Sequence, residues 1–355
     1  MKSPMDLLQA KGVSRRDFVK LMAATTAALG LPLTMQPKVA EAVENAMKKP
    51  PVIWLEGQDC AGCSESTLAS LNPSAEQLIL DMISLRYHET VMAATGDVAK
   101  KAFEDTYNEG NYVLIVEGSI PKADDRYCVI GGTPFRQHVM EAASKASAIV
   151  AIGACATYGG VVRTTPSQGM GVSEFVKDKP VINLPLCPVK PTTLFGTLVY
   201  YLTYKSAPPM DKYNRPLAFF GDLMHDNCPR RGHFDTSEFL QDWNDPSQKE
   251  WCLLLKGCKG PQTYSDCGQV WWNDNTSYCI QAGSPCAGCS QPEFYDGFSP
   301  LYQKQEGFNT PGINPDTVGK VIGGAAALGV VAHLGAKAIN SGKGDDKNKG
   351  KGVSK

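Results

Sequence analysis

The sequence predicts an α/β protein, a doubly wound parallel sheet followed by an irregular, cysteine-rich domain. From residue 51 to about residue 220, short continuous apolar runs alternate with amphipathic helical patterns. Uninterrupted apolar strands separated by helices are typical of a parallel sheet that is covered on both faces. After residue 220 the alternation fades and cysteines become dense.

The predicted elements fit an ordinary globular core. Strands are expected at residues 51–57, 112–118, 148–154 and 181–186, and helices at 98–108, 135–145 and 192–201. The net charge of −1 argues against a nucleic-acid partner, and the mean hydropathy of −0.22 argues against a polytopic membrane protein. Twelve cysteines among 355 residues are too sparse for a disulfide scaffold.

The first residues are typical of an export signal. Arg15 and Arg16 precede a weakly apolar stretch at residues 21–31, and Ala40-Glu41-Ala42 has the small residues that a signal peptidase accepts. We therefore expect a twin-arginine signal over residues 1–42, a route that exports proteins already folded with their cofactors. The alternative is an amphipathic helix with two surface arginines.

A second apolar segment lies near the other end of the chain. Residues 321–336 carry no formal charge, and residues 318–339 are long enough to span a bilayer, with Lys320 and Lys337 able to reach its interfaces. We expect a transmembrane anchor at 318–339, followed by a disordered basic tail at 340–355. The alternative is an Ala/Gly-rich helix on the protein surface.

A first group of cysteines follows three of the predicted strands. Cys60 and Cys63 come after the first strand, Cys155 after the third and Cys187 at the end of the fourth. The carboxyl ends of parallel strands lie along one edge of the sheet, so these distant residues should converge. Four thiolates at such an edge suit a tetrahedral metal ion or a 4Fe–4S cluster.

The cysteine-rich segment offers enough ligands for two further centres. It contains one well-placed histidine and seven cysteines: His225, Cys228, Cys252, Cys258, Cys267, Cys279, Cys286 and Cys289. Zinc is the ordinary interpretation of a single Cys-x2-Cys pair, and disulfides are the alternative for an exported protein. Three metal centres on one chain that is exported folded favour iron–sulfur clusters, which would also stabilise a segment with little core.

Eight ordered motifs resemble the small subunit of nickel–iron hydrogenases of the periplasmic, membrane-associated uptake type. They are SRRDFVK at 14–20, WLEGQDCAGCSES at 54–66, EGSIP at 117–121, GACATYGG at 153–160, LCP at 186–188, HDNCPRRGHFD at 225–235, CLLLKGCKGP at 252–261 and PCAGCSQPEF at 285–294. The resemblance implies a flavodoxin-like domain at residues 43–220 and an iron–sulfur cluster domain at residues 221–317.

The resemblance implies three clusters in a line. A proximal 4Fe–4S cluster would be held by Cys60, Cys63, Cys155 and Cys187, and a distal 4Fe–4S cluster by His225, Cys228, Cys252 and Cys258. A medial cluster would be held by Cys267, Cys286 and Cys289. It is 3Fe–4S in most members, but Cys279 matches a position where many members carry proline, so we expect a fourth ligand and a 4Fe–4S cluster of lower potential. The alternative is a buried, inert Cys279 and a 3Fe–4S medial cluster.

Two other features bear on this resemblance. Oxygen-tolerant members carry extra cysteines at the positions of Gly62 and Gly160, so an ordinary cubane and inhibition by oxygen are expected here. Cys128 is left over as a plain buried thiol. Asp59 is either a charge beside the proximal cluster or a solvated carboxylate, and His333 either approaches a haem-bearing partner or simply packs.

The implied function is electron transfer in a heterodimeric hydrogenase on the periplasmic face of the cytoplasmic membrane. Hydrogen would be cleaved at the nickel–iron site of a large subunit, so no catalytic residue is expected in this chain. Electrons would pass to a membrane cytochrome b or a multihaem cytochrome c, leaving near the surface at His225. The alternatives are an iron–sulfur subunit of a quinone oxidoreductase-related complex, a nickel-binding catalytic subunit, and an exported binding protein with disulfides.

Overall fold

The computed structural model describes residues 50–294 and six isolated residues, Lys20, Ala23, Pro32, Thr34, Gly329 and His333. The chain divides into two compact units, Met1–Lys304 and Gln305–Lys355, and residues 50–294 belong to the first. Apart from these six isolated residues, the predicted export signal and anchor lie outside the described residues. In the part of the chain that is described, no helix is long and apolar enough to cross a membrane.

The described elements alternate between strands and helices up to residue 204. The strands are β1 (Pro51–Glu56), β2 (Ser84–His88), β3 (Val113–Glu117), β4 (Ile120–Pro121), β5 (Val129–Ile130), β6 (Thr133–Pro134), β7 (Ala148–Ile152), β8 (Gly169–Met170) and β9 (Val181–Leu184). The α-helices are α4 (Gly62–Leu68), α5 (Ala75–Gln77), α6 (Gly96–Glu109), α7 (Phe135–Lys145), α8 (Gly153–Tyr158), α9 (Pro191–Tyr204), α10 (Leu217–Phe220), α11 (Arg231–Asp235) and α12 (Trp272–Asn275).

Shorter turns complete the description. A π-helical turn, η2 (Leu78–Met82), follows α5. The 3-10 turns are η3 (Asp125–Tyr127), η4 (Gly160–Thr164), η5 (Val172–Glu174), η6 (Pro246–Gln248), η7 (Leu254–Lys256) and η8 (Gly260–Gln262). Three of them lie between residues 246 and 262, where no strand is assigned within the described segment.

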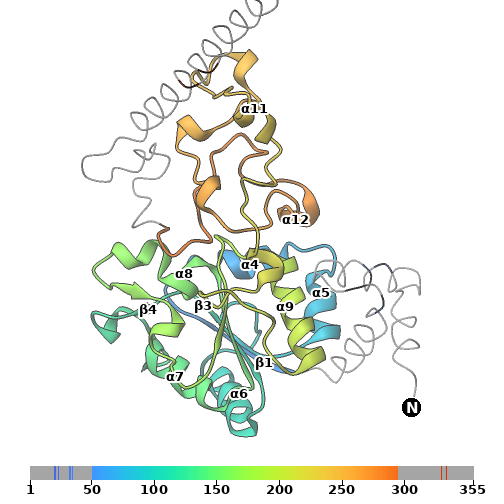
Figure 1. Cartoon of the computed structure of the whole chain (residues 1–355). Coiled ribbons are helices and arrows are strands. Elements are labelled where there is room, and N and C mark those ends of the chain that lie inside the picture. The colour runs from blue at the N-terminus through green and yellow to red at the C-terminus, as the bar shows by residue number, and fades with distance from the viewer. Residues whose placement is uncertain are drawn as a thin grey trace, which may run out of the picture. The chain divides into compact units, whose positions relative to one another are not determined.

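The central sheet has five parallel strands in the order β2-β1-β3-β7-β9. Figure 1 shows the sheet with α6, α7 and α9 around it. Alternate residues of each strand enter two different cores, one on each face. Helices α6 and α7 pack on one face through Phe103, Phe135 and Val139, whereas α9 packs on the other through Leu194 and Leu198. The sheet is therefore covered on both faces, which confirms the predicted mixed α/β fold with a parallel sheet.

The predicted elements agree closely with the structure, and their ends follow from local chemistry. All four predicted strands form, and the three predicted helices are α6, α7 and α9. Helix α9 begins with Pro191, whose missing N–H costs nothing in a first turn, and α6 stops at Gly110, whose φ of 68° favours glycine. Strand β2 was not predicted because it is an edge strand that alternates apolar and polar residues.

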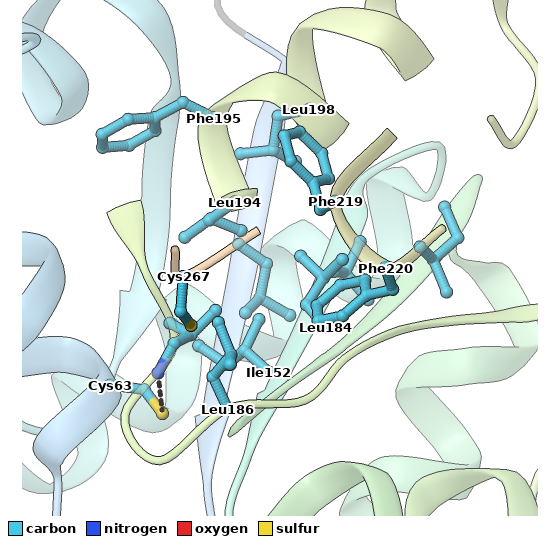
Figure 2. Packing of buried hydrophobic residues seen from close by; sticks show 14 of the residues in the cluster. Cys63, Ile152, Leu184, Leu186, Leu194, Phe195, Leu198, Phe219, Phe220 and Cys267 are labelled. Atoms are coloured by element: carbon cyan, nitrogen blue, oxygen red, sulfur yellow. Dashed lines mark hydrogen bonds between the residues drawn. The ribbon is translucent and has the colours of Figure 1, made fainter. Parts of the chain in front are cut away.

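The segment after residue 204 has little regular structure of its own. It shares a hydrophobic core with the α9 face of the sheet, and this core includes Phe219, Phe220, Leu253 and Tyr278 together with strand residues such as Ile152. Figure 2 shows part of this packing, with Cys63 and Cys267 at its margin. The irregular segment is therefore anchored on the sheet by apolar burial.

Candidate functional site

The first group of cysteines gathers at the carboxyl end of the sheet. Cys60 follows β1, Cys63 lies in α4, Cys155 lies in α8 directly after β7, and Cys187 follows β9. All four line one cavity of about 70 Å³. The topology thus brings together four thiols that are up to 127 positions apart in the chain, as expected for the edge of a parallel sheet.

Glycines allow the backbone to lie directly against three of these sulfurs. A Cβ atom at Gly153 would lie 2.5 Å from Cys63 Sγ, one at Gly160 2.8 Å from Cys155 Sγ, and one at Gly62 3.1 Å from Cys60 Sγ. Gly153 also has a φ of 78°, a conformation that L residues rarely adopt. A side chain at any of these positions would press on a sulfur that faces the cavity.

The sulfur of Cys63 is held by the backbone around it. The Val189 N–H donates to Cys63 Sγ at 3.4 Å (Figure 2), and the Cys63 N–H donates to Glu117 at 3.0 Å. Burial raises the pKa of the Cys63 thiol well above its ordinary value and raises that of Cys155 to about 12. Binding of a metal here would therefore release protons, because the ligand is the thiolate.

Asp59 belongs to this cavity. The Asp59 side chain lines it, and its Oδ1 accepts a hydrogen bond from the Ala61 N–H at 3.0 Å. Its second oxygen is buried and has no partner among the described residues, and burial raises the pKa of the carboxyl group. Asp59 therefore lies beside the four thiols, and its role as a charge next to a cluster stays a prediction.

A buried acid network, which the sequence did not predict, adjoins α4. The Ser64 hydroxyl lies 2.6 Å from Glu117 Oε2, 2.9 Å from Glu56 Oε1 and 3.2 Å from His88 Nε2. The hydroxyl can donate its single proton to only one of the two carboxyl oxygens. The other carboxyl group must therefore be protonated and donate to the hydroxyl. Burial raises the pKa of Glu117 to about 7 and lowers that of His88 to about 4. These residues are spread over four elements, and no single motif pairs them.

The second group lines a separate, smaller cavity. His225, Cys228, Cys252 and Cys258 surround a space of about 10 Å³. The His225 ring packs edge-on against Phe234 at 4.5 Å, and burial lowers its pKa, which favours the neutral imidazole that binds metals. Arg230 donates hydrogen bonds to the backbone carbonyls of Lys249 and Trp251, and these bonds hold the stretch of backbone that precedes Cys252.

The third group lies in the irregular segment. Cys267 is buried, Cys286 and Cys289 are half-buried, and burial is the main cause of the raised pKa values of Cys286 and Cys289. The neighbouring Cys267 thiol adds to both shifts, so the three sulfurs lie near one another. The Cys286 N–H donates to Cys258 Sγ at 3.4 Å, which joins the second group to the third.

Cys279 lies beside this third group although the residue is exposed. Burial raises the pKa of Cys267 and Cys289, and the Cys279 thiol contributes a smaller part of both shifts. It also contributes to the raised pKa of Cys187 in the first group. Cys279 therefore lies near sulfurs of both the first and the third group.

The remaining cysteine is separate, and no disulfide forms. All twelve cysteines fall within residues 50–294, and all are free thiols. Cys128 lies between η3 and β5 and lines neither cavity. Among the described residues, no three His, Cys, Asp or Glu side chains converge on the position of a single metal ion; the first two groups surround cavities instead.

Two family models match successive parts of the chain. Residues 60–201 match the 20 kDa subunit of NADH ubiquinone oxidoreductase, and residues 220–302 match the C-terminal region of NiFe/NiFeSe hydrogenase small subunits. The first match contains the first cysteine group and ends before the other two. A quinone oxidoreductase subunit would therefore leave the second and third groups unexplained.

Relatives match the chain as a whole. The uptake hydrogenase small subunit of Azotobacter vinelandii is 39% identical over 94% of this chain and 95% of its own length. The quinone-reactive Ni/Fe-hydrogenase small chain of Wolinella succinogenes is 41% identical over 92% and 96%. The structure of the Ni-Fe-Se hydrogenase from Desulfomicrobium baculatum aligns with a TM-score of 0.68 and 36% identity over 72% of this chain and 100% of that one. The chain therefore belongs to the small subunits of nickel–iron hydrogenases.

Proposed function

We propose that this subunit conducts electrons between the nickel–iron site of a large subunit and an external acceptor, through three iron–sulfur clusters. One observation carries the proposal: thiols from three separate strand ends line one cavity, with glycines directly against their sulfurs. The second and third cysteine groups come later in the sequence, within the described residues. An iron–sulfur cluster supplies one-electron redox chemistry when bound.

The proposed ligand sets follow the three groups. The proximal cluster is held by Cys60, Cys63, Cys155 and Cys187, the distal cluster by His225, Cys228, Cys252 and Cys258, and the medial cluster by Cys267, Cys279, Cys286 and Cys289. The donor chemistry fits, because each set offers four thiol or imidazole ligands, the kinds that hold iron–sulfur clusters. The link from the Cys286 N–H to Cys258 Sγ supports electron exchange between the medial and distal sites.

The cluster types are part of the proposal. Cys279 supplies the fourth medial ligand, which makes that cluster 4Fe–4S. Gly62 and Gly160 lie directly beside Cys60 and Cys155, and glycine at these two positions supplies no additional thiol to the proximal site. The proximal cluster is then an ordinary cubane, and the enzyme is inhibited by oxygen.

Export and anchoring complete the proposal. The twin-arginine motif at Arg15 and Arg16 directs the folded subunit to the periplasm, and residues 318–339 anchor it to the cytoplasmic membrane. The large subunit covers the first cysteine group. The name of the Wolinella succinogenes relative supports a quinone-linked acceptor, reached through a membrane cytochrome b, ahead of a multihaem cytochrome c.

Two activity assays distinguish electron transfer through this subunit from hydrogen cleavage at the large subunit. Exchange between H2 and D2O needs no net electron flow, whereas reduction of a dye by H2 needs the whole relay. In the heterodimer, Cys252→Ala should reduce dye reduction at least about tenfold and leave isotope exchange within about twofold of wild type. Cys128→Ala is the matched control. If Cys252→Ala leaves both activities intact, the second group is not part of the electron path.

A further inference from the structure

Lys190 is a fully buried lysine that belongs to none of the cysteine groups. It lies between β9 and α9, and its side chain is 0% exposed. The ammonium group donates to Asp266 Oδ1 and, at 2.8 Å, to the Val270 carbonyl, and it lies 5.7 Å from the ring centre of Trp272. A buried charge is costly unless it is paired and hydrogen-bonded. These partners explain how the fold retains it.

The partners of Lys190 flank Cys267. Asp266 directly precedes it and Val270 follows three residues later, and the Val270 N–H donates to the Asp266 carbonyl at 2.8 Å. Lys190 therefore binds both ends of the turn that presents Cys267. Cys267 packs in the same buried cluster as Leu194 of α9 (Figure 2), so Lys190 ties the edge of the sheet to the third cysteine group.

The Lys190 ammonium is a fixed positive charge held beside Cys267. It contacts Asp266, the residue directly before Cys267, and the Val270 carbonyl, and its side chain is fully buried. The Asp266 carboxylate offsets part of this charge, but water screens little in such a setting.

We propose that Lys190, oriented by Asp266, is a positioning residue that raises the reduction potential of the cluster held by the Cys267 group. The inference rests on the proposed function, because it requires a cluster at that group. Reduction adds one electron and therefore one negative charge to the cluster, and a fixed positive charge nearby stabilises the reduced state. A fourth ligand from Cys279 would lower the reduction potential of this cluster, and the Lys190 ammonium would raise it.

The test is a redox titration of the purified heterodimer, followed by EPR spectroscopy, on wild type and three variants. Lys190→Met keeps the length of the side chain and removes its charge, and Lys190→Arg keeps the charge. Lys190→Met combined with Asp266→Asn removes both charges. Arg136→Met, which breaks the remote pair with Asp125, is the control for loss of an ion pair.

The expected result is a shift of one cluster toward more negative potential. The shift should be largest in Lys190→Met, which leaves the Asp266 carboxylate unopposed, smaller in the double variant and smallest in Lys190→Arg, with the other clusters unmoved. Lower thermal stability with unchanged potentials would assign Lys190 a purely structural role and overturn the inference. Wild-type protein without a cluster at the Cys267 group would instead contradict the proposed function.

Discussion

Cys279 is the residue whose role is tested most simply. Its thiol lies beside Cys267 and Cys289 but is more exposed than either. If Cys279 completes a 4Fe–4S centre, Cys279→Ala should lose about one iron per chain and give a 3Fe–4S signal in the EPR spectrum of the oxidised heterodimer. Cys128→Ala should change neither. A Cys279→Ala spectrum and iron content identical to those of wild type would remove Cys279 from the ligand set.

Glu89 is expected to make stability depend on pH. Its carboxyl accepts a hydrogen bond from the Glu56 N–H at 3.0 Å, and burial raises its pKa from 4.5 to about 8. The folded protein therefore holds this proton at pH values where the unfolded chain has released it. Stability should fall as the pH rises from 4.5 to 8, and the full loss is present above pH 8.

The variant Glu89→Gln removes this titration. It should match wild type near pH 4.5 and be more stable at pH 8.5 by about 1–2 kcal/mol, or about 2–8 °C in melting temperature. Thermal denaturation of the heterodimer across this pH range measures the difference. The exposed Glu76→Gln is the matched control. A pH profile for Glu89→Gln that runs parallel to wild type would contradict the raised pKa.

Among the elements, the junction of β7 with α8 requires a glycine, and we expect that Gly153 there cannot be replaced by a residue with a side chain. Gly153 and Gly131 both have positive φ, 78° and 56°, so replacement by alanine strains both backbones by about 1–2 kcal/mol. Only at Gly153 does the new Cβ meet a sulfur, that of Cys63, whereas nothing lies within 4 Å at Gly131. Gly153→Ala should therefore lose the proximal cluster, about four irons per chain, while Gly131→Ala retains it.

Iron analysis of the two glycine variants distinguishes local strain from pressure on the sulfur. Equal iron contents in the purified heterodimers would mean that the cavity adapts to the added methyl group. An equal loss in both would mean that backbone strain alone is responsible.

The sequence predicted those strands and helices whose pattern of apolar residues lies within one short stretch of the chain. Continuous apolar runs located β1, β3, β7 and β9, and helical periodicity located α6, α7 and α9. The convergence of Cys60, Cys155 and Cys187 also followed, because it depends only on the carboxyl ends of parallel strands meeting at one edge. Short helices such as α4 and α8 carry too few residues for a periodic signal.

Contacts between distant side chains could not be read from the sequence. Lys190 and Asp266 are 76 positions apart, and neither belongs to a motif that pairs them. The hydrogen bonds that Ser64 makes to Glu56 and Glu117 likewise join separate elements. Such pairs depend on how the elements pack across the core. The hydrophobic pattern and the spacing of residues predict the elements, but not which individual side chains meet.

At the scale of the whole molecule, export should depend on the arginine pair. Replacement of both Arg15 and Arg16 by lysine removes the feature that the twin-arginine route reads. The heterodimer should then accumulate in the cytoplasm with its clusters inserted, and little of it should reach the periplasm. Cell fractionation with an antibody to the subunit measures this distribution, and Lys11→Arg, which leaves the pair intact, is the control. Unchanged export of the double variant would contradict the predicted signal.

We propose that one polypeptide holds three iron–sulfur clusters in series. Iron and acid-labile sulfide content of the anaerobically purified heterodimer, corrected for the iron of the large subunit, tests it most directly. We expect about twelve irons and twelve sulfides per small subunit, from three four-iron clusters. About four irons per chain, with the remaining cysteines oxidised to disulfides, would contradict it.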